Sequence, residues 1–278
     1  MKRAVLLILF LLLVPGIAIA GSRVVASIYT IGHFATKVMG AEVITIMPSG
    51  VDPHEYEPTP RDIRDVYGAE VFIYQGGGLD PWAERIAPEL IKRGVRVLSI
   101  MEIEGLETAR GNPHVWLDPL NAVLEVREMA RLLGELDPDN KAIYMNNATD
   151  YIEELHGLDA RYISALETCE LDTVVVSHDA YAVIALRYGF KTLPISGTSR
   201  DEEPSLRKLA RIVDTMNSSG IGYVLADAME SQRFAETVAR ETGAELLLLH
   251  PLGGLLDGSY ESVMLDNLEV LRKALKCQ

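Results

Sequence analysis

Short apolar segments typical of β-strands alternate with amphipathic segments typical of helices along most of this chain, and glycine ends most of the helical segments. Neighbouring parallel strands need a long crossover, usually a helix, and helices then cover both faces of the sheet. The alternation therefore predicts parallel sheets inside an α/β fold. We expect strands within residues 23–28, 42–48, 70–75, 95–100, 173–177, 191–196, 222–228 and 244–251.

One segment, residues 139–168, interrupts this rhythm. Its hydrophobic residues recur mostly at helical spacing, and Gly157 is the only helix-breaking residue among them. A helix of about 25 to 30 residues at 1.5 Å per residue approaches about 40 Å in length. We predict two α/β domains, each with a mostly parallel four-stranded sheet flanked by helices, joined by one long connecting helix. The predicted parts are an N-terminal lobe at 21–138, the helix at 139–168 and a C-terminal lobe at 169–278.

The first twenty residues have the features of a secretory signal. Lys2 and Arg3 precede an apolar run at residues 4–14, and small residues lead up to Ala20. The run is short for a membrane span, which needs about 20 apolar residues. We predict a signal peptide at 1–20, cleavage after Ala20, and an exported protein in the periplasm or at the outer face of the cell membrane. An uncleaved N-terminal anchor is the alternative.

Charge and cysteine content narrow the possible functions. The chain has 26 Lys and Arg against 40 Asp and Glu, a formal net charge of −14. Such an acidic surface repels phosphate backbones, which argues against nucleic-acid binding. Cys169 and Cys277 can pair in an exported chain, but their spacing does not decide whether they do. Neither lies in a C-x-x-C pair, so no thiolate metal site is predicted.

Four of the six histidines share a setting. His54 follows the second predicted strand, His114 lies in a proline-containing segment, and His178 and His250 end strands in the second half. Ligands of open α/β sheets bind beyond the carboxyl ends of the strands, so these rings can face each other across a cleft. Imidazole is a common zinc ligand. Their spacing alone is also compatible with structural roles, to which we assign the remaining histidines, His33 and His156.

Catalytic motifs are weak in this sequence. The glycine-rich segment after the third strand lacks the G-x-G-x-x-G spacing, and there is no Walker lysine and no G-x-S-x-G elbow. A hydrolytic zinc site keeps an open coordination position, which four protein ligands would close. We therefore expect a protein that is not an enzyme. Two alternatives stay open: a secreted zinc hydrolase that uses three histidines as ligands and His250 as a base, and a metal-independent adhesin or structural protein.

Four short motifs carry a family resemblance. They are "VDPHEYEPTPRDI", "NPHVWLDP", "SHDAYAVIALRYGF" and "LHPLG". Together they resemble the zinc- and manganese-specific solute-binding proteins of ABC transporters, the ZnuA/TroA-like family, along essentially the whole mature chain. The resemblance implies two α/β domains joined by a single long helix, with the metal between them. It further implies a monomer that captures a divalent metal and delivers it to an ABC transporter permease in the membrane.

The resemblance also assigns the metal ligands. His54, His114 and His178 match the family's ligand positions, whereas His250 stands where aspartate is common and Asn112 replaces the usual aspartate of the second motif. Carboxylates favour harder ions, so an all-imidazole set favours Zn2+, with Mn2+ and Fe2+ as alternatives.

We expect nearby acidic residues to orient the rings, the candidates being Asp118, Asp179, Glu55 and Glu57. Because each ligand must lose its proton, affinity should fall as the pH drops through about 6.5. The stiff connecting helix predicts little domain movement on binding.

Overall fold

Two parallel four-stranded sheets organise the molecule, as the sequence predicts. A computed structural model describes residues 23–48, 50–197, 203–228, 231–251 and 258–278, so the signal peptide predicted at 1–20 lies outside the described residues. The first sheet has the strand order β2-β1-β3-β4 and the second the order β6-β5-β7-β8. The strands are β1 (Val24–Ala26), β2 (Ile44–Thr45), β3 (Val71–Tyr74), β4 (Arg96–Ser99), β5 (Thr173–Val176), β6 (Lys191–Pro194), β7 (Tyr223–Asp227) and β8 (Glu245–Leu249).

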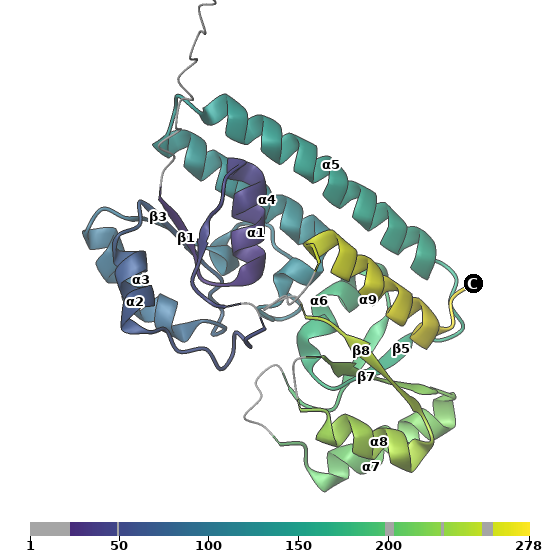
Figure 1. Cartoon of the computed structure of the whole chain (residues 1–278). Coiled ribbons are helices and arrows are strands. Elements are labelled where there is room, and N and C mark those ends of the chain that lie inside the picture. The colour runs from purple at the N-terminus through teal and green to yellow at the C-terminus, as the bar shows by residue number, and fades with distance from the viewer. Residues whose placement is uncertain (1–22, 49, 198–202, 229–230, 252–257) are drawn as a thin grey trace, which may run out of the picture.

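Helices cover both faces of each sheet and connect its strands (Figure 1). They are α1 (Tyr29–Met39), α2 (Pro60–Tyr67), α3 (Pro81–Lys92), α4 (Pro119–Leu136), α5 (Lys141–Leu166), α6 (Ala182–Tyr188), α7 (Leu206–Ser219), α8 (Arg233–Thr242) and α9 (Tyr260–Leu275), with short 3-10 turns η1 (Ile100–Glu102), η2 (Val115–Leu117) and η3 (Asp179–Tyr181). Local sequence fixes several of their starts. At α2, the Thr59 hydroxyl accepts from the Asp62 amide and the Asp62 carboxylate accepts from Thr59 N–H, a capping box with proline at the first helical position.

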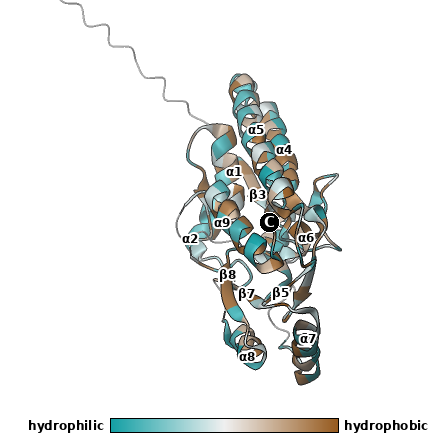
Figure 2. Cartoon of the chain, turned by 90° about the vertical axis from the view of Figure 1, so that its right-hand side faces the viewer, coloured by the Kyte–Doolittle hydropathy of each residue, from teal (hydrophilic) through white to brown (hydrophobic). Residues whose placement is uncertain are grey.

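The long connecting helix is α5, which has 26 residues. Its buried face carries Tyr151, Leu155 and Tyr162, whereas Ile143 and Ile163, two other hydrophobic residues of the predicted helix, are 43% and 55% exposed and lie outside that face. Figures 1 and 2 show α5 running side by side with α4, and Figure 2 shows hydrophobic and hydrophilic residues alternating along both.

Helix α4 is an element that we did not expect. The Asp118 carboxylate caps it by accepting from Leu120 N–H, and Pro119 occupies its first turn. This pair of residues is a helix-start signal that was readable in the sequence. Helix α4 lies directly after the "NPHVWLDP" segment, so it anchors the loop that carries His114 to the long helix behind it.

The hydrophobic core is continuous between the two sheets. Val24 and Ala26 of β1 belong to the same buried cluster as Val174 and Val176 of β5, together with residues of α1, α4, α5 and α9. Alternate strand residues enter separate cores on the opposite faces: one contains Val25, Phe72 and Trp82, the other Val175, Val224 and Val238. Both faces of the strands are therefore buried, as parallel sheets require. None of the described helices is long and apolar enough to cross a membrane.

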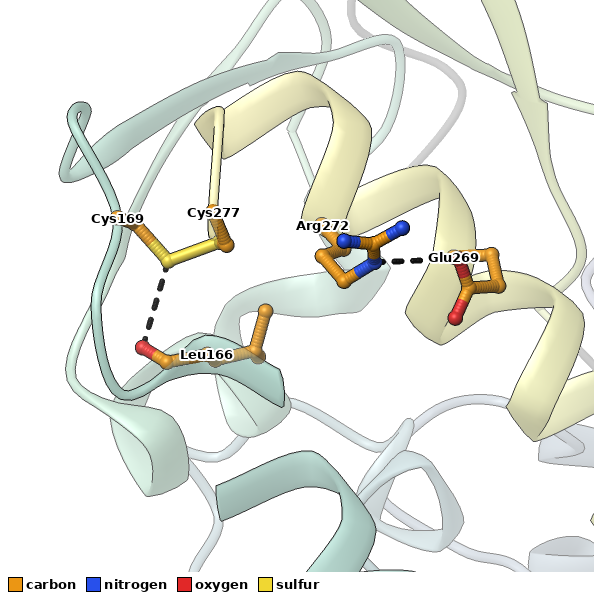
Figure 3. Close-up of a disulfide and its surroundings, with 5 residues drawn as sticks. All are labelled: Leu166, Cys169, Glu269, Arg272 and Cys277. Atoms are coloured by element: carbon orange, nitrogen blue, oxygen red, sulfur yellow. Dashed lines mark hydrogen bonds and ion pairs between the residues drawn. A yellow bond between two sulfur atoms is a disulfide. The ribbon is translucent and has the colours of Figure 1, made fainter. Parts of the chain in front are cut away.

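A disulfide joins Cys169 to Cys277 across 108 positions of sequence, which settles the pairing that spacing had left open (Figure 3). The two residues also form an isolated antiparallel bridge. Cys169 precedes β5, and Cys277 follows α9. The bond therefore ties the start of the second sheet to the end of the chain.

Candidate metal centre

Three of the four predicted histidines converge on one point. Their ligand atoms all lie within 4.8 Å of one another, and the three residues are His54, His114 and His178. The Nε2 atom of His114 lies 3.1 Å from Nε2 of His54 and 3.4 Å from Nε2 of His178. A tetrahedral zinc ion with bonds of 2.0–2.1 Å holds its nitrogen ligands about 3.3–3.4 Å apart. The His114 nitrogen thus lies close to one tetrahedron edge from each of the other two nitrogens.

Three different segments bring these rings together. His54 lies in the loop between β2 and α2, where its backbone N–H donates to the Asp52 carboxylate at 2.8 Å. His114 directly precedes η2, and His178 follows β5 and directly precedes η3. His114 and His178 are 2% and 1% exposed, whereas His54 is partly exposed. The group therefore combines two fixed, buried rings with one that reaches solvent.

The fourth predicted ligand, His250, lies apart from this group. Among the described residues the converging group has three members, and His250 is not one of them. It follows the edge strand β8 and is exposed. Its backbone is held by α9: His250 N–H donates to Asn267 Oδ1 at 2.9 Å, and Asn267 Nδ2 donates to the His250 carbonyl at 2.8 Å. The structure therefore brings three of the four predicted ligands together and leaves His250 outside the group.

Burial keeps the two inner rings neutral. It lowers the pKa of His114 well below its usual 6.5, and the neighbouring rings of His178 and His54 lower it further. Burial also lowers the pKa of His178 to about 4, although a hydrogen bond with the Gly197 backbone opposes the shift. Neutral imidazole is the form that binds metal. Competition by protons at these two rings should therefore begin below the pH of about 6.5 that the free amino acid suggests.

The polar support of His114 comes from an amide that the sequence analysis missed in this role. Asn112 Oδ1 accepts from the His114 backbone N–H at 3.0 Å and lies 2.7 Å from His114 Nδ1. On its other side, Asn112 Nδ2 donates to the Asp179 carbonyl at 2.6 Å. The available signal was the two-residue spacing before the histidine, which suits a side-chain-to-backbone turn.

Asp118, which we expected to orient a ring, has a different partner. Its fully buried carboxylate accepts from Arg187 Nε at 2.8 Å and pairs with Arg187 Nη2 at 2.7 Å. Burial raises the pKa of Asp118, and the hydrogen bond from Arg187 acts against that rise. Asp179 is also engaged elsewhere, because its side chain accepts from the Thr192 hydroxyl at 3.1 Å. The two carboxylates therefore bond to neighbouring side chains, Arg187 and Thr192, in the structure around the rings.

Direct bonds join the two halves of the molecule beside the rings. The indole Nε1 of Trp116 donates to the Pro251 carbonyl at 2.7 Å, and the Tyr260 hydroxyl donates to the Trp116 carbonyl at 2.7 Å. Both contacts are buried. They fix η2, which directly follows His114, against Pro251 after β8 and against Tyr260 at the start of α9. Hydrogen bonds between the two halves of the molecule therefore fix the position of the segment next to His114.

Two parallel sheets that share a core, with a cluster of three imidazole rings between them, define a metal-binding α/β protein. The chain belongs to the family described as zinc-uptake complex component A, periplasmic, whose sequence profile matches residues 24–274.

Relatives and solved structures agree with this assignment. The chain is 30% identical to the zinc-binding lipoprotein AdcA of Streptococcus pneumoniae, over 90% of this chain and 55% of that protein. It is 29% identical to the high-affinity zinc uptake system protein ZnuA of Bacillus subtilis, over 91% and 87% of the two chains. The laminin-binding protein Lmb of Streptococcus agalactiae superposes with a TM-score of 0.84 at 32% identity, covering 92% of this chain and all of that one. The chain spans about half the length of AdcA.

Proposed function

We propose that this protein captures zinc with high affinity and delivers it to an ABC-type importer in the membrane. The observation that carries this proposal is the spacing of three imidazole Nε2 atoms, 3.1 Å and 3.4 Å apart around His114. Manganese and ferrous iron are the alternative cargoes. Similarity to AdcA and ZnuA, which are named for zinc binding and zinc uptake, supports zinc.

Metal capture starts from rings that are already in place. His114 and His178 are buried and neutral, so they bind the ion without first losing a proton. His54 is partly exposed on a loop that contains Pro53 and Pro58, and proline restricts such a loop before binding. We place the access route for the metal past His54. Few side chains then need ordering when the ion exchanges its water for nitrogen.

Delivery requires a partner outside this chain. The proposed partner is the membrane permease, and the proposed setting is the periplasm or the outer face of the cell membrane, with the protein as a monomer. Similarity to a lipoprotein and to a periplasmic family supports export. The proposed lobes, residues 21–138 and 169–278 on either side of the helix 139–168, share one core. That continuity supports small movements on binding.

Calorimetry on protein stripped of metal tests the proposal. We expect zinc to bind with a dissociation constant far below micromolar and to displace manganese in competition. No affinity tighter than micromolar would overturn the transport function. Tighter binding of manganese or ferrous iron would overturn the choice of metal.

The proposal contains no catalytic step, and this separates it from a secreted zinc hydrolase. The converging group contains imidazole nitrogens and no carboxylate oxygen among the described residues. The zinc-loaded protein should therefore not turn over ester or peptide substrates. Zinc-dependent turnover that is lost in His114→Ala would support the hydrolase instead.

A further inference from the structure

One amide side chain, Asn112, contacts both buried ring-bearing segments. Its oxygen lies 2.7 Å from His114 Nδ1, and its nitrogen donates at 2.6 Å to the carbonyl of Asp179, the residue after His178. Asn112 is 4% exposed, so water does not compete freely for these bonds.

The backbone dictates which way this amide points. The His114 backbone N–H can only donate, so the atom 3.0 Å from it must be the amide oxygen. The Asp179 carbonyl can only accept, so the atom 2.6 Å from it must be the amide nitrogen. A flipped amide would lose both bonds and bring like groups together. The two halves of the molecule thus jointly hold the Asn112 oxygen toward His114.

This orientation decides where the proton of the His114 ring sits. A neutral imidazole carries one proton, on Nδ1 or on Nε2. The Asn112 oxygen accepts only, so at 2.7 Å it requires the proton on Nδ1. Nε2 then keeps its lone pair, and Nε2 is the atom 3.1 Å and 3.4 Å from the other two rings.

We infer that Asn112 is a positioning residue for metal capture, which locks His114 in the Nδ1–H tautomer with the Nε2 lone pair aimed at the site. The inference rests on the proposed function. A partner of this kind typically contributes about 10–100-fold to metal affinity. Asn112 does this without a charge, because an amide accepts from the ring and donates across to the other half of the molecule.

Nitrogen-15 NMR of the histidine rings in metal-free protein tests the inference, because ring shifts distinguish the two tautomers. We expect Nδ1–H at His114 in the wild type. Asn112→Ala should shift the ring toward Nε2–H and weaken zinc binding about 10–100-fold. Asn112→Asp keeps an acceptor for Nδ1–H, so it should restore the tautomer and most of the lost affinity.

Asn121, in the first turn of α4, provides a matched control that is also a buried asparagine. It accepts from Glu107 N–H and donates to the carbonyls of Glu107 and Val115, without a bond to the ring. Asn121→Ala should destabilise the fold and leave the tautomer of His114 unchanged.

An Nε2–H ring in the wild type, or an unchanged Nδ1–H ring in Asn112→Ala, would overturn the inference. Equal tautomer shifts in Asn112→Ala and Asn121→Ala would also overturn it. If the tautomers behave as expected but the wild type binds no zinc, the transport proposal fails alone and the role of Asn112 in orienting the ring stands.

Discussion

Two histidines follow strands of the same sheet but differ in burial and in their distance from the metal centre. His178 comes after β5, an inner strand with β6 and β7 on either side, and it is 1% exposed. His250 comes after β8, the edge strand, and it is exposed. His178 joins the converging group and His250 does not. In this sheet, the ring after the inner strand lies in the group and the ring after the edge strand lies outside it.

Neighbouring strands explain this difference. The Ser177 hydroxyl accepts from Asp227 N–H at 2.9 Å, and Ser177 N–H donates to the Leu225 carbonyl at 2.8 Å, so the end of β5 is bonded to β7 up to the residue before His178. On its other side, the Ser177 carbonyl accepts from Ser196 N–H at 2.9 Å. The residue before His250 is bonded to β7 alone, through Ala228 N–H and the Leu249 carbonyl at 2.9 Å, because β8 is the edge strand, and the His250 backbone is held by Asn267 of the outer helix α9. In the first sheet, His54 follows the edge strand β2 but reaches the group on a loop. An edge position thus needs a loop to carry its ring inward.

The largest effect should separate the two histidines directly. His178→Ala removes a converging nitrogen and should weaken zinc binding by more than the roughly 100-fold attributed to loss of a supporting contact. His250→Ala removes an exposed ring and should leave the affinity near that of the wild type. Calorimetry on both variants measures the difference. Equal losses would show that His250 is a ligand after all.

Loss of the disulfide should lower the stability of the fold and leave the zinc affinity unchanged. The disulfide closes a loop of 108 positions between the segment before β5 and the end of α9. Loop-closure entropy predicts a loss of about 5 kcal/mol in the free energy of unfolding for Cys169→Ser with Cys277→Ser. Denaturant unfolding of the metal-free protein measures the loss. A large change in zinc affinity would show that the bridge also positions His178.

Acid should destabilise the metal-free protein through the buried ring. Burial lowers the pKa of His178 from 6.5 to about 4. Between these pH values the ring is protonated in the unfolded chain and neutral in the folded protein. Stability is then fully present above pH 6.5 and is lost as the pH falls toward 4, by about 3 kcal/mol. Unfolding of His178→Asn across this range should show a shallower slope than the wild type. The same flattening in the control, His250→Asn, would contradict this assignment.

The smallest effects concern the residues that hold each histidine. Ser177→Ala removes the acceptor of a buried N–H, which should cost about 2 kcal/mol of stability and weaken zinc binding. Asn267→Ala removes two bonds to the His250 backbone. Because His250 is exposed, water can replace them, so the cost should be about 1 kcal/mol. Zinc affinity should not change in that variant. A reversed order of affinities would contradict the comparison between inner and edge strands.

Periodic features of the sequence predicted the architecture well. The strand and helix alternation predicted both sheets, and the hydrophobic spacing in 139–168 predicted α5 nearly to its ends. These features are local, since each depends on neighbours a few residues apart. Helix α4 was not predicted, although Asp118 and Pro119 mark its start with an ordinary capping signal.

The site was less predictable because its geometry is not local. The sequence singled out the three converging histidines, but position after a strand could not show that β8 lies at an edge. Likewise, Asp118 is an acid near a histidine in sequence, yet its partner Arg187 is 69 positions away. The sequence shows Asn112 only as an asparagine where the family motif has aspartate, because its contact with Asp179 crosses 67 positions and forms only in the folded chain.

X-ray absorption spectroscopy of the zinc-loaded protein tests the central claim most directly, because it counts the imidazole ligands around the metal. The spacing of His54, His114 and His178 predicts three imidazoles at about 2.0–2.1 Å, with the same spectrum for His250→Ala and a loss of one imidazole for His178→Ala. Four imidazoles in the wild type, reduced to three by His250→Ala, would contradict the account.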